Sequence, residues 1–163
     1  MAILFHKKKE QDTTDVKQMI VCPSCQKEIS KEDAVLNHYI CTACGSYFRK
    51  KTKNRIRMVC DRGSFIPWFE EMDICNPLDF PGYEEKLSDV KEKTGLHEAV
   101  TVGMGEIYGE KVCLGVCDAR FLMSSMGHVM GEKIACAVER ATEEGMPVIL
   151  FCCSGGARMQ EGI

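Results

Sequence analysis

Four cysteines in two closely spaced pairs are the residues of this sequence best suited to bind a metal. Two residues separate Cys22 from Cys25 and Cys41 from Cys44, and fifteen residues lie between the pairs. A two-residue gap lets a tight turn present both sulfurs to one ion, and two such turns complete the tetrahedral shell that zinc prefers. The spacing predicts a structural zinc site. Two redox-active pairs would instead need a helix directly after one pair in a β-α-β setting, and the sequence indicates none.

Four sulfur ligands leave no position for water, so the predicted zinc would stabilise the fold and take no part in hydrolysis. A module of about forty residues buries too little surface to fold without such help. His38 could replace one cysteine, although a solvated or packed histidine explains it as well. The remaining cysteines are expected to act mostly as small core residues; they are Cys60, Cys75, Cys113, Cys117, Cys136, Cys152 and Cys153.

A glycine pair directly after an apolar run is the second feature that could support chemistry. Residues 147–153 form a run too short for a helix, which predicts a fully buried strand. Gly155 and Gly156 follow, and glycine lets a ligand approach the backbone closely. A helix beginning there would direct free N–H groups at an anion or at an oxygen gaining negative charge. An ordinary turn explains the same residues, so the pair alone does not establish a site.

The segment before the last predicted helix strengthens this interpretation. Ser125 is a candidate N-cap, and Gly145 with Pro147 ends the helix. Its predicted apolar face consists of Met130, Ile134, Ala137, Val138 and Ala141. Strand, helix and strand in that order predict a right-handed β-α-β crossover. The crossover would bring Ser124–Gly127 and Ser154–Arg158 to one edge of the sheet, where such folds bind ligands.

Little side-chain acid–base chemistry is evident at this predicted site. His128 is the only titratable base candidate, and a packed or exposed histidine is an equally simple interpretation. The methionines nearby are expected to fill the core; they are Met123, Met126, Met130 and Met146.

Several further elements are predicted upstream. Residues 49–57 carry six cations, and Thr52 could cap a helix with Ile56 and Val59 on its apolar side. The cations could form a solvated face, or bind the phosphates of a nucleic acid or a nucleotide-like cofactor. A charged helix is expected over residues 83–95, and strands over 98–107 and 111–119 are expected to form a hairpin.

Charge is distributed unevenly along the chain. Residues 1–60 contain twelve Lys/Arg and six Asp/Glu, whereas residues 61–163 contain nine and eighteen. We predict a tail over 1–19, a zinc ribbon over 20–48, a basic and charged helical linker region over 49–97 and a second domain over 98–163. No apolar run approaches the roughly 18 residues of a membrane span, and the first residues do not resemble a secretory signal. A cytoplasmic protein is expected.

Three parts of the sequence together resemble a known family. The cysteine quartet, the stretch Met126–Lys133 and above all Ser154–Gly162 are similar to the β subunits of bacterial and plastid acetyl-CoA carboxylase carboxyltransferases. The resemblance implies an α/β protein with a four-cysteine zinc ribbon followed by the start of a crotonase-like spiral of ββα units. It implies transfer of a carboxyl group from carboxybiotin, held on a carrier protein, to acetyl-CoA, which yields malonyl-CoA for fatty acid synthesis.

The same resemblance implies partners and site residues. The partners would be a carboxyltransferase α subunit in an α2β2 heterotetramer, biotin carboxyl carrier protein and biotin carboxylase. Gly155, Gly156 and Ala157 would line the acetyl-CoA site together with Ser154, and Ser125 and Gly127 would lie close by. Arg158 would either offer charge to a CoA phosphate or pair with a carboxylate.

Two departures from the family pattern are evident. Ser124 and Ser125 stand where the family often has glycine, and the catalytic oxyanion glycines would lie after Ile163. We therefore expect an N-terminal part of a longer chain or a truncated product, inactive by itself.

The alternative function is a zinc-ribbon protein that binds nucleic acid through residues 49–57, which steep weakening by salt would reveal. A biotin-dependent decarboxylase or a propionyl-type transferase is a further alternative, against which the ribbon argues.

Overall fold

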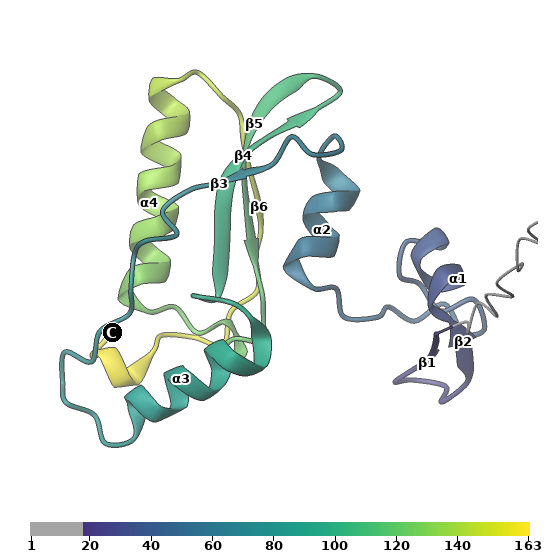
Figure 1. Cartoon of the computed structure of the whole chain (residues 1–163), viewed down its shortest axis with the longest axis horizontal. Coiled ribbons are helices and arrows are strands. Elements are labelled where there is room, and N and C mark those ends of the chain that lie inside the picture. The colour runs from purple at the N-terminus through teal and green to yellow at the C-terminus, as the bar shows by residue number, and fades with distance from the viewer. Residues whose placement is uncertain (1–17) are drawn as a thin grey trace, which may run out of the picture. The chain divides into compact units, whose positions relative to one another are not determined.

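The computed structural model describes residues 18–163, which form two compact units (Figure 1). The first unit ends at Lys50 and the second runs from Lys51 to Ile163. Most of the predicted tail over residues 1–19 lies outside the described residues. Between residues 18 and 163 there is no helix long and apolar enough to cross a membrane.

The first unit is built around the cysteine pairs. Strands β1 (Met19–Val21) and β2 (Glu28–Ser30) pair in antiparallel fashion. Helix α1 (Lys31–Leu36) follows at once, because the Ser30 hydroxyl accepts hydrogen bonds from the N–H groups of Glu32 (3.1 Å) and Asp33 (3.3 Å). Its small core contains Cys22, Ile29, Ala34 and Cys41. The spacer between the pairs therefore includes a helix that the sequence reasoning did not predict.

A four-stranded sheet forms the centre of the second unit. Its order is β3 (Ile66–Pro67), β4 (Val100–Ile107), β5 (Glu110–Cys117) and β6 (Val148–Phe151). The predicted hairpin is confirmed, since β4 and β5 pair in antiparallel register. Its two-residue turn, Tyr108 and Gly109, has positive φ at both positions, as tight hairpins require. Strands β5 and β6 are parallel.

Helix α4 (His128–Glu143) covers one face of the sheet and connects β5 to β6 (Figure 1). Three residues of its predicted apolar face, Met130, Ala137 and Ala141, are buried. Val138 of the same predicted face is instead 38% exposed. The predicted N-cap at Ser125 is wrong, because Gly127 is the N-cap and the helix begins at His128. Strands β4 and β5 with α4 form one ββα unit.

Helix α2 (Thr52–Val59) packs on the opposite face, where Ile56 and Val59 contact the cluster of Cys60, Leu114 and Val116 (Figure 1). Thr52 is its first helical residue and not its N-cap, which is Lys51. A carboxylate that is distant in sequence caps the start of the helix, since the Thr52 N–H (3.1 Å) and the Thr52 hydroxyl (2.8 Å) both donate hydrogen bonds to Asp118. Residues 51–97, expected mainly as a linker, thus contribute α2 and β3 to the second unit.

Helix α3 (Tyr83–Thr94) agrees with the helix predicted over residues 83–95. Gly95, in the left-handed conformation, ends it, and the side chains of Tyr83 and Leu87 are buried. These two residues join the main core, which also contains Val100, Val102, Cys113, Phe121, Met130 and Ala137.

The last strand differs from its prediction. Strand β6 lies at the edge of the sheet, and Val148 and Leu150 are 38% and 40% exposed, so it is not fully buried. It ends at Phe151, which leaves Cys152 and Cys153 exposed beyond it. Cys75 is exposed as well, whereas Cys60 and Cys113 are buried as expected. No helix begins at the glycine pair either, and only a 3-10 turn, Met159–Glu161, follows.

Candidate functional site

The two segments that the sequence placed at one site lie against each other. The Met126 N–H donates to the Gly156 carbonyl (2.8 Å), and the Arg158 N–H donates to the Met126 carbonyl (2.9 Å). Nearby, the Gly155 N–H donates to the Ser124 carbonyl (3.3 Å). A short stretch of parallel pairing thus joins the segment before α4 to the segment after β6.

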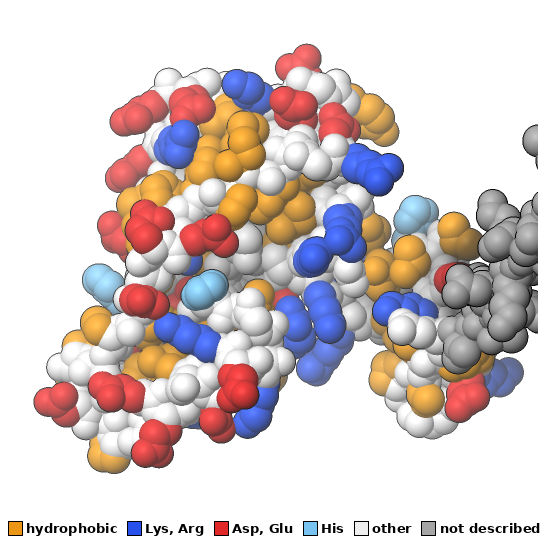
Figure 2. All heavy atoms as spheres, in the orientation of Figure 1, with side chains coloured by type: hydrophobic (Ala, Val, Ile, Leu, Met, Phe, Trp, Pro, Cys, Tyr) orange, Lys and Arg blue, Asp and Glu red, His pale blue; other side chains and the backbone are white. Residues whose placement is uncertain are grey.

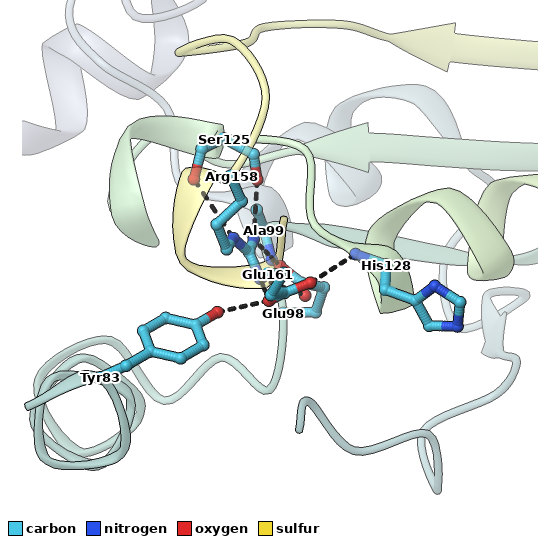
Figure 3. Close-up of polar contacts among 7 residues, drawn as sticks. All are labelled: Tyr83, Glu98, Ala99, Ser125, His128, Arg158 and Glu161. Atoms are coloured by element: carbon cyan, nitrogen blue, oxygen red, sulfur yellow. Dashed lines mark hydrogen bonds and ion pairs between the residues drawn. The ribbon is translucent and has the colours of Figure 1, made fainter. Parts of the chain in front are cut away.

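Arg158 is at the centre of a buried polar cluster beneath these segments (Figure 3). Its guanidinium donates two hydrogen bonds to the Glu98 carboxylate, from Nη1 (2.9 Å) and Nη2 (2.6 Å). It also donates to the Ser125 carbonyl (2.7 Å) and to Glu161 (3.0 Å). Of the two roles expected for Arg158, the structure therefore shows pairing with carboxylates. The side chain is too buried to contact a CoA phosphate.

Glu161 connects this cluster to two helices. One carboxylate oxygen accepts from the Tyr83 hydroxyl of α3, and the other accepts from the His128 N–H at the start of α4 (2.5 Å). Burial would raise the pKa of Glu161, but hydrogen bonds from Tyr83, His128 and Arg158 outweigh burial and lower it. Burial and the bond to Glu161 raise the pKa of Tyr83. Both groups are therefore held in one protonation state near neutral pH.

The cluster contains titratable residues that sequence reasoning missed. Glu98 and Glu161 are buried carboxylates, and Lys133, also buried, lines a cavity of about 80 Å³ together with Glu98. Burial lowers the pKa of Lys133, while the charge of Glu98 opposes that shift. The sequence signalled only Glu161, which lies in the segment Ser154–Gly162. Nothing in the sequence indicates that Glu98 lies beside Arg158.

Glycine is required at position 127 because the buried polar cluster leaves no room for a side chain, and not because a ligand needs open space there. A Cβ atom at this position would lie 2.5 Å from Arg158 Nη1 and 2.6 Å from Glu161 Oε2. Gly155 is similarly constrained, since its Cβ would lie 2.9 Å from the Met123 carbonyl oxygen. Gly156 differs, because it has φ of +93° and a Cβ atom added there would have nothing within 4 Å. Gly156 is therefore the glycine with free space beside it.

The backbone before α4 is strained. Leu122, Met123 and Ser124 are consecutive non-glycine residues with φ of 43°, 56° and 58°. The Ser124 hydroxyl is buried without a hydrogen-bond partner among residues 18–163. Such strain persists where the surrounding structure imposes it, and it is common at functional sites.

The N–H groups expected to face a ligand are mostly engaged within the protein. The Gly156 N–H donates to the Ser154 hydroxyl (3.0 Å), and Gly155 donates to Ser124 as described above. The Ala157 N–H has no such partner in the described part of the chain, and Ala157 is exposed. The surface here thus presents the Ala157 N–H beside the open side of Gly156.

Side chains around this surface are thioethers rather than acids or bases. Met123, Met126 and Met159 are 63%, 47% and 75% exposed, so the expectation that Met123 and Met126 fill the core is wrong. Met130 and Met146 are buried as expected. The His128 imidazole is exposed and points away from the cluster, which only its N–H contacts (Figure 3).

The cysteine quartet has the geometry of a tetrahedral zinc site. The sulfurs of Cys22 and Cys44 are 3.7 Å apart, those of Cys25 and Cys41 are 3.8 Å apart, and all four lie within 4.8 Å of one another. Sulfurs bound at about 2.3 Å around a tetrahedral ion are about 3.8 Å apart. Both turns have the same form, with Gln26 and Gly45 at positive φ directly after the second cysteine. The residues present therefore fit zinc.

Comparison with known proteins identifies relatives of this fold. Residues 49–163 match the family model described as the carboxyl transferase domain. The chain is 47% identical over 142 residues to the acetyl-coenzyme A carboxylase carboxyl transferase subunit beta of Carboxydothermus hydrogenoformans, covering 87% of this chain and 51% of that protein. The subunit of the same name from Clostridium botulinum (strain Kyoto / Type A2) is 44% identical over 158 residues, covering 97% and 55%.

A solved structure is similar as well. Transcarboxylase 12S with methylmalonyl-coenzyme A bound is 25% identical, with a TM-score of 0.58, over 70% of this chain and 20% of that chain. The α/β fold class with crotonase-like relatives is thereby confirmed. The chain spans about half the length of the curated relatives it matches. Since the family model covers most of the sequence, the chain belongs to the carboxyl transferase domain family.

Proposed function

We propose that this chain is the β-type part of an acetyl-CoA carboxylase carboxyltransferase, which transfers the carboxyl group of carboxybiotin to acetyl-CoA and forms malonyl-CoA. The observation that carries this proposal is the 47% identity to a subunit of that name, over a region that includes both paired segments. The partners would be a carboxyltransferase α subunit in an α2β2 assembly, a biotin carboxyl carrier protein and biotin carboxylase.

In the proposed reaction the acetyl methyl group loses a proton, and the resulting enolate carbon attacks the carboxyl carbon of carboxybiotin. The bond between the carboxyl carbon and the biotin nitrogen then breaks, and biotin can take up the proton that the methyl group lost. The chain's own contribution would be to bind and orient the thioester, with the Ala157 N–H donating beside the open face of Gly156. A fixed donor aimed at a developing negative charge stabilises an enolate. Ser154, Ser125 and Gly127 would support this surface through the contacts described above.

We also propose that the quartet holds structural zinc and that the protein works in the cytoplasm. The sulfur geometry supports the first proposal. The second is supported by eleven cysteines that form no disulfide among the described residues, as expected in a reducing compartment. A nucleic-acid role for residues 49–57 is not favoured, because these residues fall within the carboxyl transferase match.

An amide NMR titration with acetyl-CoA tests the binding part of the proposal. We expect the signals of Gly156, Ala157 and Met126 to shift in a dose-dependent way, while that of Gly145, at the far end of α4, remains in place. Unmoved signals of Gly156 and Ala157 at millimolar acetyl-CoA, in a spectrum that reports a folded protein, would refute it.

The chemistry is tested by reconstitution with a matching α subunit and carboxybiotin. Malonyl-CoA should form only when this chain, or a longer form that contains it, is present. Replacement Gly156→Val should abolish formation, because a branched side chain at φ of +93° is strained and occupies the open space. Gly131→Ala, in α4, is the matched control and should retain activity. Equal product with and without this chain would contradict the proposal.

A further inference from the structure

Lys133 of helix α4 is a buried cation. Its side chain is 4% exposed, yet it forms no hydrogen bond and no ion pair with any other residue among 18–163. Removal of an ammonium group from bulk water is unfavourable unless other groups accept its hydrogen bonds and balance its charge. The fold must therefore provide both around Lys133 without a direct contact.

A cavity of about 80 Å³ lies beside the Lys133 side chain. Glu98 and Trp68 line it as well, and the exposed residues Glu70 and His97 border it. One water molecule needs roughly 10–15 Å³ of such space, so several fit. Water in this cavity would accept hydrogen bonds from Lys133 and donate hydrogen bonds to Glu98. Such a bridge is nearly as favourable as a direct hydrogen bond.

The buried polar cluster beneath the paired segments is short of one positive charge when Lys133 is left out. Within the described part of the chain, Arg158 is the one cation that forms ion pairs with Glu98 and Glu161. Tyr83 adds no charge, because its raised pKa keeps the hydroxyl protonated. Two buried carboxylates and one guanidinium leave one net negative charge, and Lys133 brings the buried groups to neutrality.

The wider surroundings of Lys133 are acidic as well. Burial lowers the pKa of Lys133, whereas the charges of Glu98, Glu70 and Glu71 oppose that shift. In Figure 2, red side chains predominate over α4 and over the segment between β3 and α3, which crosses this helix in Figure 1. These charges favour a cation in the cavity and disfavour a bound anion.

We propose that Lys133 is a positioning residue for the candidate site, whose ammonium balances the second buried carboxylate through water in the cavity. Without this charge, Glu98 and Glu161 would repel each other around a single guanidinium. Arg158 would then hold Ser125 less firmly, and the two paired segments would lose their fixed arrangement. The inference rests on the proposed function for its ligand, because acetyl-CoA is the molecule that these segments would orient.

Replacement of the missing charge by a small amine tests the assignment. Lys133→Ala should lower the midpoint of thermal unfolding by roughly 5–15 °C. Propylammonium, which matches the atoms removed and is charged at pH 7, should restore at least half of this loss at tens of millimolar. 1-Propanol, of similar size but uncharged, should restore much less. Trp68, the single tryptophan of the chain, lines the cavity, so its emission should report binding of the amine.

Calorimetric titration with acetyl-CoA, at a temperature at which wild type and variant are both folded, tests the positioning role. Lys133→Ala should weaken binding about fivefold to thirtyfold, the range expected for groups linked in one network. Propylammonium should restore the affinity, which a change in stability alone would not explain. The matched control is Lys86→Ala, which removes an exposed cation of α3 and should alter neither the affinity nor the response to the amine.

A second pair of variants serves if Lys133→Ala does not fold. Lys133→Arg keeps the charge and should retain acetyl-CoA affinity, whereas Lys133→Met, of similar length and without charge, should lose it. Equal affinity of these two variants would overturn the proposal.

Equal restoration of stability by 1-propanol and propylammonium would also overturn it, since filled space and not charge would then be what Lys133 contributes. Wild-type affinity in folded Lys133→Ala, or no response of this variant to propylammonium, would do the same. If the wild-type protein itself binds no acetyl-CoA, the proposed function is refuted. The effect of the amine on stability then still decides whether Lys133 balances the cluster.

Discussion

Arg158 and Glu98 are sixty residues apart in sequence and form a two-pronged ion pair in which both side chains are at most 1% exposed. Glu98 directly precedes Ala99 before strand β4, and Arg158 follows β6, so the pair joins the first and last strands of the β4-β5-α4-β6 arrangement. Through Ser125 and Glu161 the same guanidinium holds both segments of the candidate site. The shape of that surface therefore depends on a buried ion pair.

Replacement Arg158→Met should destabilise the protein by about 3–5 kcal/mol, because it leaves the carboxylates of Glu98 and Glu161 buried without their cation. Urea unfolding followed by circular dichroism measures the change. Lys93→Gln is the control, since its pair with Asp89 is exposed and should contribute less than about 1 kcal/mol. Similar effects of both replacements would show that the buried cluster does not support the fold.

Alanine replacements of two glycines, one at the N-cap of α4 and one within it, should change the stability of the protein in opposite directions. Gly127→Ala should destabilise the protein by about 1–3 kcal/mol, since its Cβ would meet Arg158 and Glu161 at 2.5–2.6 Å. Gly131→Ala, within α4 and with nothing within 4 Å, should stabilise it by about 0.5–1 kcal/mol through helix propensity. Thermal unfolding of both variants checks the sign. A neutral Gly127→Ala would mean that the cluster has room to move.

Ser124→Gly should stabilise the protein by about 1 kcal/mol. The change removes a buried hydroxyl without a partner and a left-handed conformation that serine adopts at a cost. Ser154→Ala is the comparison, because it removes the acceptor of the Gly156 N–H and should be neutral or slightly destabilising. Chemical denaturation at 25 °C distinguishes them. Loss of stability in Ser124→Gly would show that the hydroxyl has a partner in solution.

Asp118 should contribute to acid sensitivity. Burial would raise its pKa, but hydrogen bonds from Arg120 and Thr52 outweigh burial and lower it from 3.8 to about 2. The folded protein thus binds this proton less tightly than the unfolded chain, so the stabilisation is complete above about pH 4 and is lost as the pH falls towards 2. Asp118→Asn should therefore lower stability at pH 7 by about 2 kcal/mol and flatten its decline between pH 4 and pH 2. Urea midpoints across that range measure both effects, and parallel pH curves would contradict the assignment.

Removal of metal should unfold the first unit selectively. Elemental analysis should find about one zinc per chain, and a strong chelator or Cys22→Ser should abolish the signals of β1, β2 and α1 in an amide NMR spectrum. Signals from β4 and β5 should persist, because their core contains no cysteine of the quartet. Cys136→Ser, half-buried in α4, is the control and should retain the zinc. Far less than one zinc with an intact first unit would refute the site.

Local patterns predicted the elements that depend on neighbouring residues. The spacing of Cys22, Cys25, Cys41 and Cys44 was sufficient to identify the quartet. Alternation around Tyr108 and Gly109 predicted the β4–β5 hairpin, and helical spacing with a terminal glycine predicted α3. In each case the relevant interactions span few residues, so sequence order carries them.

Residue order alone was therefore enough to predict the cysteine quartet, the helices α2, α3 and α4, the strands β4, β5 and β6, and the proximity of Ser124–Gly127 to Ser154–Arg158. Which groups satisfy one another became evident only in the folded molecule. Asp118, rather than the predicted cap Thr52, accepts the hydrogen bonds at the start of α2, and Glu98 and Glu161 form ion pairs with Arg158. The edge position of β6 likewise depends on which strands surround it. A buried charge must be paired with an opposite charge that lies close to it in the folded protein. The sequence alone does not indicate which distant carboxylate the fold brings next to Arg158.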